Sequence, residues 1–230
     1  MDYNDLLDLL KKRRSIRKFK PDPVPDEYVD KIIEAARWAP SGANSQPWQF
    51  IVIKKKDLRE KIFELHNQGQ VEVRKMEALR DDEELRFNFG PRSFDVAPVF
   101  ILVCGDTRLK DCFPFIGAMS DHGGKILESS LASTFLYMML AATTLGLGAH
   151  WVTAVNSPVL QILMKRLLGI PKELLIYDMM VLGYPDMIPP PRMVRDKKDI
   201  VHYDGYDKSK LATDKQIRDF IIKIRKSGGM

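Results

Sequence analysis

The sequence predicts an α+β fold in which one central sheet has helices on both faces. Short apolar runs typical of buried strands alternate with segments of helical periodicity. No two-residue hairpin turn joins one strand to the next, so helices separate consecutive strands. With 230 residues, the chain is long enough for one domain with a sizeable core, or for one domain plus an arm.

The first forty residues predict two helices joined by an extended connector. Four leucines between positions 6 and 10 suggest a short amphipathic helix, and three prolines make residues 21–25 extended. Apolar residues with spacing i, i+3, i+4 and i+7 predict a second helix, which begins at the acidic pair Asp26 and Glu27. Pro40 ends it, because proline cannot continue a helix. A buried strand at 48–53 and a helix at 58–65 follow.

Residues 66–95 differ from the rest of the chain in composition. They are good helix-forming material with opposite charges at i, i+4 spacing but a thin apolar face, and Phe87, Phe89 and Phe94 come at the end. One interpretation is a variable segment that forms a lid over an active site, with the phenylalanines contacting substrate. The other is a surface excursion that its aromatic residues pin to the core.

The second half predicts three more strands, at 96–104, 149–155 and 175–182. The first contains Pro98, so we expect it near a sheet edge or bulged there. A long helix at 125–145 is apolar all round in its second half. Ser157 and Pro158 are typical of a helix start, and that helix runs to residue 168.

The C-terminal residues 204–230 predict an arm and a helix, which can pack on a partner subunit. Residues 200–203 suggest a short strand. Thr213 and Gln216 form the pattern of a capping box that opens a helix with one apolar face. That face must cover either the rest of its own chain or a second subunit.

Bulk properties exclude several classes of protein. A net charge of +5 in short, dispersed clusters argues against nucleic-acid binding. The sequence begins without a secretory signal pattern, and Cys104 and Cys112 form neither a metal nor a redox motif, so we expect a cytoplasmic protein. Residues 129–164 lack Asp, Glu, Lys and Arg, but the longest unbroken apolar run, 135–142, is too short to span a bilayer. We expect a buried helix there and no membrane contact.

Two polar motifs suggest a binding site. Arg13, Arg14, Ser15 and Arg17 offer guanidinium forks and a hydroxyl, which are the groups that clamp a phosphate. The loop from Pro40 to Trp48 holds amide and hydroxyl groups between two prolines, an arrangement that suits a flat, hydrogen-bonding ligand. Taken singly, the first can be a solvated basic face and the second an ordinary loop.

In tandem these motifs resemble those of the FMN-dependent nitroreductase family, which opens with Arg-Arg-Ser-x-Arg and continues with Pro-Ser-x-x-Asn-Ser-Gln-Pro-Trp. Residues 145–154 also resemble that family's Leu-Gly-Leu-Gly-x-x-Trp element. The similarity runs from residue 6 to about 203 and implies one FMN-binding domain over 1–203. It implies a three-layer fold, with a central mixed sheet of four or five strands between helices, in an intertwined homodimer with the 125–145 helix at its centre.

The resemblance also implies the roles of particular residues. Arg13, Arg14, Ser15 and Arg17 would contact the phosphate, the ribityl chain and the pyrimidine edge of FMN, with Arg17 the one most easily exposed instead. Asn44 would bond the polar edge of the ring, supported by Pro40, Ser41 and Gln46, often from the neighbouring subunit. For Gln46 the alternative is a side chain that stabilises the loop.

The strand end at 151–154 would contact the reactive part of the flavin. A backbone N–H, aligned here to Thr153 with Trp151, Val152 and Ala154 beside it, would reach flavin N5. A basic residue near the C-terminus, Arg195 or else Arg192, would reach the phosphate, although Arg-Met-Val-Arg-Asp replaces the usual Arg-Lys-Pro-Leu. His150 could act as an acid, but a lone histidine entering a strand is more often structural. No catalytic side chain and no metal site is predicted.

The implied activity is transfer of hydride from NADH or NADPH through flavin N5 to an electron-poor acceptor, such as a nitroaromatic compound or a quinone, by a ping-pong mechanism. Relatives within the fold catalyse reductive dehalogenation or flavin fragmentation, and these are alternatives. Two further alternatives are not enzymes. One is a flavin-binding protein without turnover, and the other is a basic adaptor that binds acidic partners.

Overall fold

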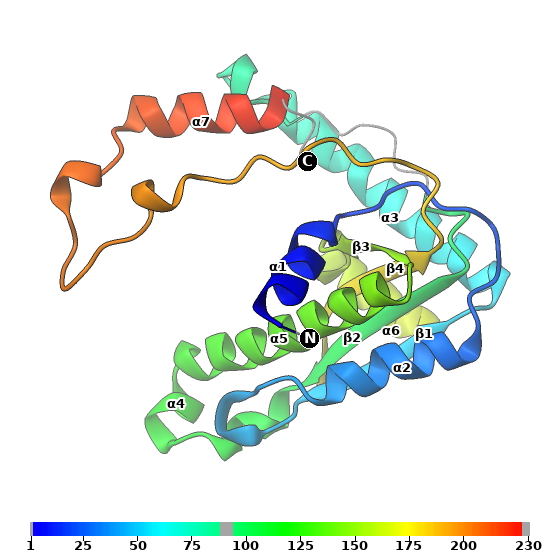
Figure 1. The fold of residues 1–230 in the computed structure, drawn as a ribbon. Helices are drawn as coiled ribbons and strands as arrows, with labels where there is room; N and C mark the ends of the chain where they lie inside the picture. The colour runs from blue at the N-terminus through cyan, green and yellow to red at the C-terminus, as the bar shows by residue number, and fades with distance from the viewer. Residues whose placement is uncertain (1, 88–93, 227–230) are drawn as a thin grey trace. The chain divides into compact units, whose positions relative to one another are not determined.

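The computed structural model describes residues 2–87 and 94–226 (Figure 1). The chain divides into two compact units. We call the first, residues 1–70 and 92–187, the sheet unit, and the second, residues 71–91 and 188–230, the arm unit. This division differs from the sequence-based boundary at residue 203, because the arm unit begins at residue 188 and also takes in residues 71–91.

The sheet unit contains a four-stranded sheet with strand order β1-β2-β4-β3. All three neighbouring pairs are antiparallel, and the parallel contribution is an isolated bridge between Ser15 and Ala149. The predicted α+β fold is thus confirmed, with a sheet that is antiparallel in its named strands. Their bounds are β1 (Trp48–Ile53), β2 (Val99–Asp106), β3 (Gly148–Val152) and β4 (Leu174–Gly183).

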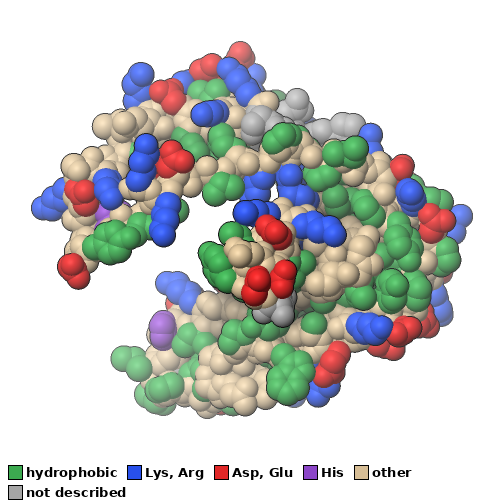
Figure 2. All heavy atoms as spheres, viewed as in Figure 1, with side chains coloured by type: hydrophobic (Ala, Val, Ile, Leu, Met, Phe, Trp, Pro, Cys, Tyr) green, Lys and Arg blue, Asp and Glu red, His purple; other side chains and the backbone are tan. Residues whose placement is uncertain are grey.

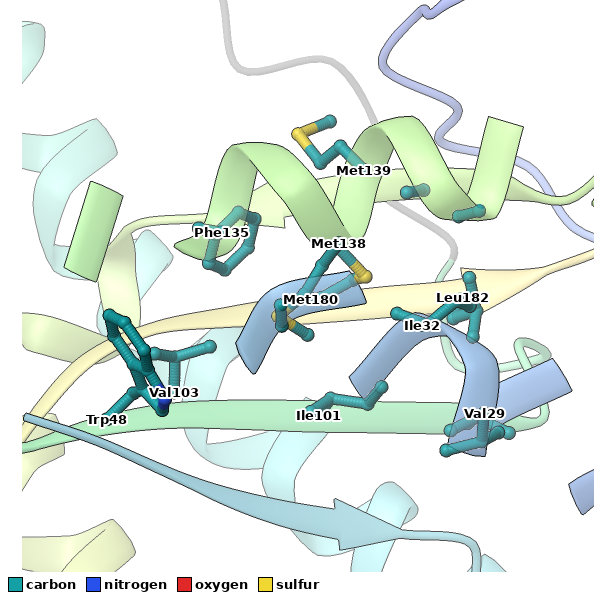
Figure 3. Packing of buried hydrophobic residues seen from close by; sticks show 14 of the residues in the cluster. Val29, Ile32, Trp48, Ile101, Val103, Phe135, Met138, Met139, Met180 and Leu182 are labelled. Atoms are coloured by element: carbon teal, nitrogen blue, oxygen red, sulfur yellow. The ribbon is translucent and has the colours of Figure 1, made fainter. Parts of the chain in front are cut away.

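One face of the sheet is covered by α2 (Asp26–Arg37) and α5 (Asp121–Thr144), with α1 (Tyr3–Lys12) also packed against α5 (Figure 1). Side chains of α2 and α5 meet those of the strands in a continuous apolar cluster (Figure 3). The buried residues of α2 follow its predicted helical spacing. Labelled members of this cluster are Val29, Ile32, Trp48, Ile101, Val103, Phe135, Met138, Met139, Met180 and Leu182.

The opposite face is covered by α6 (Pro158–Leu168) and the first part of α3 (Lys56–Glu77), through Met164 and Ile62. Two-residue alternation along the strands sorts their side chains between these two clusters. Gly169 ends α6 in the left-handed conformation, with φ at 65°, as its sequence position predicts.

The helix α5 is, within 2–87 and 94–226, the one helix long and apolar enough to cross a membrane. Its inner residues, including Leu127, Leu131 and Phe135, are packed in the core of the sheet unit. Core helices of globular domains satisfy the same criterion, and the burial of this face agrees with the predicted core helix.

At Pro98 the sequence-based expectation is wrong, whereas the position of Phe94 agrees with one of its two interpretations. Pro98 lies before β2, which is a central strand between β1 and β4, so this strand is neither an edge nor interrupted by proline. Phe94, interpreted either as a substrate contact or as a residue that pins its segment to the core, is fully buried with Phe63 and Phe100 around it, which agrees with the second interpretation. It anchors the end of the 66–95 segment, while Phe89 lies outside the described residues.

The arm unit contains α7 (Asp214–Lys226) and the short helix η2 (Glu83–Leu85). Arg218 of α7 binds the carboxylate of Asp82 through two nitrogens, at 2.9 and 3.1 Å, and also contacts Glu84. The capping box forms as predicted, because Thr213 and Gln216 exchange backbone-to-side-chain hydrogen bonds. The predicted strand at 200–203 is irregular chain instead.

Candidate functional site

The arginine-rich element leaves α1 and joins the free edge of β3. Arg13 caps the C-terminus of α1, donating its N–H to the carbonyl of Leu9. The N–H of Ile16 then donates to the carbonyl of Ala149 over 3.0 Å, next to the Ser15 bridge. The sheet edge therefore holds the backbone of this element in place.

A glycine in β3 permits this close approach. A Cβ atom at Gly148 would lie 2.8–2.9 Å from three carbons of the Ile16 side chain, nearer than packed atoms come. Ile16 is buried at this contact. Because Ile16 points into the core, its neighbours Ser15 and Arg17 point elsewhere along the extended chain.

The polar side chains of the element are half-buried. Arg13, Arg14, Ser15 and Arg17 share this intermediate exposure, whereas Lys18 is exposed. Burial lowers the pKa of the Arg17 guanidinium from its ordinary value, yet arginine remains protonated at neutral pH. Arg17 is thus not the exposed member of the set, contrary to expectation.

The proline-bracketed loop is held in a conformation that amino acids with side chains rarely adopt. Ala43, Asn44 and Gln46 have φ angles of 50°, 51° and 44°. Ser41 stabilises this turn, since its hydroxyl accepts the N–H of Gln46 over 3.0 Å and its carbonyl accepts that of Asn44. Left-handed backbone at residues other than glycine costs free energy and concentrates at functional sites.

The same loop presents its polar residues outward. Pro40, Asn44 and Gln46 are exposed, and Ser41 is half-buried. The side chain of Gln46 lies 3.4 Å from the carbonyl of Asn44, in agreement with a loop-stabilising role. Nothing in this geometry prevents Asn44 from contacting a ligand.

Within one chain, the loop and the arginine-rich element are anchored at different ends of α5. Gly42 donates its N–H to the hydroxyl of Ser130 in the first half of the helix. The arginine-rich element is anchored at Gly148, just beyond the C-terminus of α5. Fifteen helical residues between Ser130 and Leu145 span roughly 22 Å. One copy of the chain therefore does not bring its two motifs to one point.

The strand end predicted to contact flavin N5 lies on the same sheet edge as the arginine-rich element. Trp151 and Val152 complete β3, and Thr153 and Ala154 turn away into the short helix η4 (Ala154–Asn156). Val152 is buried, while Thr153 is exposed. From Ala149 to Thr153, extended chain covers about 13 Å. Cations and strand end thus lie along one edge of the sheet, a few residues apart.

Arg192 and Arg195 belong to the arm unit, unlike the other candidates. Both are exposed, and the Arg195 guanidinium lies 5.7 Å from the centre of the Phe220 ring. Arg195 also lines a cavity of about 660 Å³ together with Lys210 and Lys223. Arg195 is therefore in cation–π contact with an aromatic ring of α7.

His150 lies in the core, where its ring centre is 6.0 Å from that of Phe94. This burial supports a structural histidine. Cys104 is likewise buried, and burial raises the pKa of its thiol to about 12. Across residues 2–87 and 94–226, no group of three or more His, Cys, Asp or Glu side chains could hold a metal ion.

One buried acid, Asp178, is not among the residues that the sequence predicted for the site. Asp178 of β4 accepts hydrogen bonds from the indole of Trp151 at 2.5 Å and from the amide of Asn156 at 3.2 Å. Desolvation raises the pKa of Asp178 to about 6, against the opposing effect of these two bonds. The sequence does contain a sign of it, because Asp178 is a charged residue within the otherwise largely apolar strand 174–183.

Comparisons with known proteins agree with this architecture. A sequence profile described as "Nitroreductase family" matches residues 10–184. The "Putative NADH dehydrogenase/NAD(P)H nitroreductase" of Methanothermobacter thermautotrophicus is 33% identical over 204 residues, which cover 88% of each chain. Rat iodotyrosine deiodinase 1 is 33% identical over 191 residues, covering 80% of this chain and 64% of that protein.

A solved structure of iodotyrosine deiodinase bound to FMN and 3-iodo-L-tyrosine superimposes on this chain with a TM-score of 0.70. The two are 26% identical, and the match covers 87% of this chain and all of the other.

Proposed function

This chain belongs to the nitroreductase family, and on that premise we propose that it is an FMN-dependent oxidoreductase that uses NADH or NADPH to reduce an electron-poor acceptor. One observation carries the proposal. Three arginines and a serine are fixed on the edge of β3 by the Ile16–Ala149 hydrogen bond, and the same edge ends at Thr153. Cations at one end and an exposed strand end at the other suit a ligand with a phosphate and a flat ring.

The arginine-rich element supplies the phosphate end. Arg13, Arg14 and Arg17 are half-buried, so their guanidinium groups act in a medium that screens charge less than water does. Guanidinium forks bind phosphate oxygens in pairs, and the hydroxyl of Ser15 adds a further donor. Holding this end fixes the position of the whole cofactor.

The strand end supplies the ring site. Bound FMN would accept hydride from the nicotinamide and pass electrons to the acceptor. The backbone N–H of Thr153 would stabilise negative charge there, since a fixed donor needs no reorganisation during the reaction. Val152, beside it, is buried and so packs the strand end against the core.

We further propose that the site is completed by a second copy of the chain. The loop at 40–46 and the arginine-rich element are anchored at different ends of α5, so Asn44 would serve the partner's site. Exposed apolar side chains lie near the loop, including Trp38, Phe115 and Ile116, with exposed fractions of 77–80%. Hydrophobic atoms are exposed over α4 (Phe115–Met119), at the lower left of Figure 2. Apolar patches of this kind mark interfaces.

The test is anaerobic titration of the purified full-length protein with FMN, followed by each nicotinamide in turn. We expect stoichiometric yellow protein that bleaches with NADH or NADPH and recovers its colour on adding a nitroaromatic compound or a quinone. Sedimentation of the same sample should give a dimer. If the protein is yellow but neither NADH nor NADPH bleaches it, the conclusion is a flavin-binding protein without turnover. Colourless protein would refute the proposal.

Reductive dehalogenation is the second candidate, favoured by the similarity to iodotyrosine deiodinase. In that reaction two electrons and one proton replace the carbon–iodine bond with carbon–hydrogen and release iodide. The reduced protein is mixed with 3-iodo-L-tyrosine, and iodide and tyrosine are measured. Stoichiometric release of both would favour this activity, whereas oxidation by nitroaromatics alone would favour the first.

A further inference from the structure

A carboxylate is buried within the sheet next to the proposed ring site. Asp178 is 2% exposed, and its neighbours along β4 are Tyr177 and Met179. In the part of the chain that the structure describes, no lysine or arginine forms an ion pair with it. Burying a charge without a cation is costly, so such a residue calls for a specific reason.

A β-bulge determines which way Asp178 points. In the β2–β4 pair, Val103 is opposite Asp178 but Cys104 is opposite Ile176, so Tyr177 is an extra residue. Ile176 therefore faces the cluster with α6, while Asp178 and Met180 share the face towards α5. Without the bulge, Ile176 and Asp178 would lie on the same face.

The carboxylate joins the two ends of one short segment. One oxygen accepts the indole N–H of Trp151, the residue before the last in β3, and the other accepts the amide of Asn156, the last residue of η4. Between these two donors lie Val152, Thr153, Ala154 and Val155. A single buried group thereby brackets the turn that contains Thr153.

The Trp151 end of this bracket is rigid. Its indole stacks on Phe135 of α5, with ring centres 4.2 Å apart and an interplanar angle of 21°. The Asn156 end is exposed, although its N–H also bonds the carbonyl of Thr153 at 3.1 Å. Asp178 thus links a half-buried tryptophan, packed against the core, to the exposed end of the turn.

Other groups face Asp178 from the elements around it. A cleft of about 360 Å³ is lined by Asp178 with Glu128 of α5, Tyr177 of β4 and Gln161 of α6. Gln161 is already bonded to both backbone groups of Ile176. Glu128 and Tyr177 are the titratable groups here, and neither is a cation at any pH.

We propose that Asp178 is a positioning residue, whose carboxylate ties Trp151 to Asn156 and so holds the backbone of Thr153 in the orientation that the flavin site requires. This inference rests on the proposed function for the flavin itself. The tie is made by three side chains of the protein itself. Removing it would leave the turn attached at β3 but free to move at η4.

The tie can be measured in ¹⁵N-labelled protein without added flavin, through the indole N–H resonance of Trp151, assigned with Trp151→Phe. We expect a downfield resonance that titrates with a midpoint near pH 6, the pKa of Asp178. In Asp178→Asn the pH dependence disappears. In Glu128→Gln, the matched control from the same cleft, the resonance still titrates.

The consequence for the site is measured by FMN titration of the same proteins. Loss of hydrogen bonds that order the turn should weaken FMN binding about 10-fold or more in Asp178→Ala. Asp178→Asn should stay within about threefold, because the Asn156 amide can turn over and accept the new N–H. Asn156→Ala removes the hydrogen bond at the exposed end of the turn and should also weaken FMN binding. If Asp178→Ala does not fold, the FMN affinity of Asn156→Ala is the test of the positioning role.

The outcomes separate the two proposals. If the unaltered protein takes up no FMN, the proposed function fails, and the role of Asp178 fails with it. If the unaltered protein binds FMN but Asn156→Ala and every folded Asp178 variant bind it equally well, only the positioning role is overturned. An indole resonance unmoved by pH and by Asp178→Asn would also overturn it.

Discussion

The backbone N–H of Ile16 donates a hydrogen bond to the carbonyl oxygen of Ala149 over 3.0 Å. Through this bond a segment from the beginning of the chain becomes an extension of β3, the strand at the edge of the sheet. Arg13, Arg14 and Ser15 are carried to that edge by it. The arginines and Thr153 are far apart in the sequence. In space, only about the length of one short strand separates them.

The first prediction concerns the cationic end of the site. Arg13→Ala should weaken FMN binding about 10- to 100-fold, because a charge-assisted hydrogen bond contributes about 1.5–3 kcal/mol. Lys18→Ala removes an exposed cation three residues from Ser15 and should change affinity less than about twofold. Fluorescence titration with FMN measures both. Equal losses would mean that only net charge matters.

The second prediction concerns the glycine beneath the arginine-rich element. Gly148→Ala forces a Cβ atom against Ile16 and should lower the free energy of unfolding by about 1–3 kcal/mol, the usual cost of overpacking. Gly124→Ala, in the first turn of α5, meets its nearest atom at 3.5 Å and should not destabilise the protein. Urea denaturation compares the two, and similar effects would contradict the close approach.

The third prediction concerns the strained loop. Ala43 is exposed at φ 50°, a conformation that glycine adopts without steric cost. Ala43→Gly should therefore raise the free energy of unfolding by about 0.5–1 kcal/mol. This is the steric cost of the left-handed conformation that the change removes, minus the extra conformational entropy that glycine loses on folding. Ala35→Gly within α2 should lower it by about 1 kcal/mol. If both substitutions lowered the free energy of unfolding, the backbone at Ala43 would not be strained.

The fourth prediction concerns pH and Asp178. Burial raises its pKa from 3.8 to about 6 in the folded protein, so between these values the folded state binds more protons than the unfolded state. Stability from this group is therefore lost as pH rises from about 4 to 6, and is then constant. The difference in unfolding free energy between the unaltered protein and Asp178→Asn should follow that course. A pH-independent difference would contradict it.

The fifth prediction concerns the arm unit. Arg218→Ala removes the contacts of α7 with Asp82 and Glu84 and should reduce amide protection against hydrogen exchange along α7. Lys215→Ala removes an exposed pair within the same helix and should leave protection unchanged. Mass spectrometry of exchanged peptides gives the comparison. Unchanged protection in Arg218→Ala would show that apolar packing alone holds the helix.

Patterns within short stretches predicted most elements. The spacing of Val29, Ile32 and Ala36 located α2, and Ser157 with Pro158 located the start of α6, because helix periodicity and caps are local properties. Pro98 was misleading, since a proline beside a strand looks like one inside it. For Phe94 the sequence leaves both a substrate contact and a core anchor open, because composition does not reveal which aromatic residue of a polar segment turns back into the core.

The sequence alone determined the chemical groups of the site: guanidiniums at 13–17, amides at 44–46 and a strand end at 151–154. Tertiary structure decided how they are grouped, since it joined the arginine-rich element to β3, anchored the loop at the other end of α5, and turned Asp178 towards Trp151 through a bulge. Periodicity shows which face of an element is buried, but the identity of the neighbours on that face depends on contacts between residues far apart in the chain.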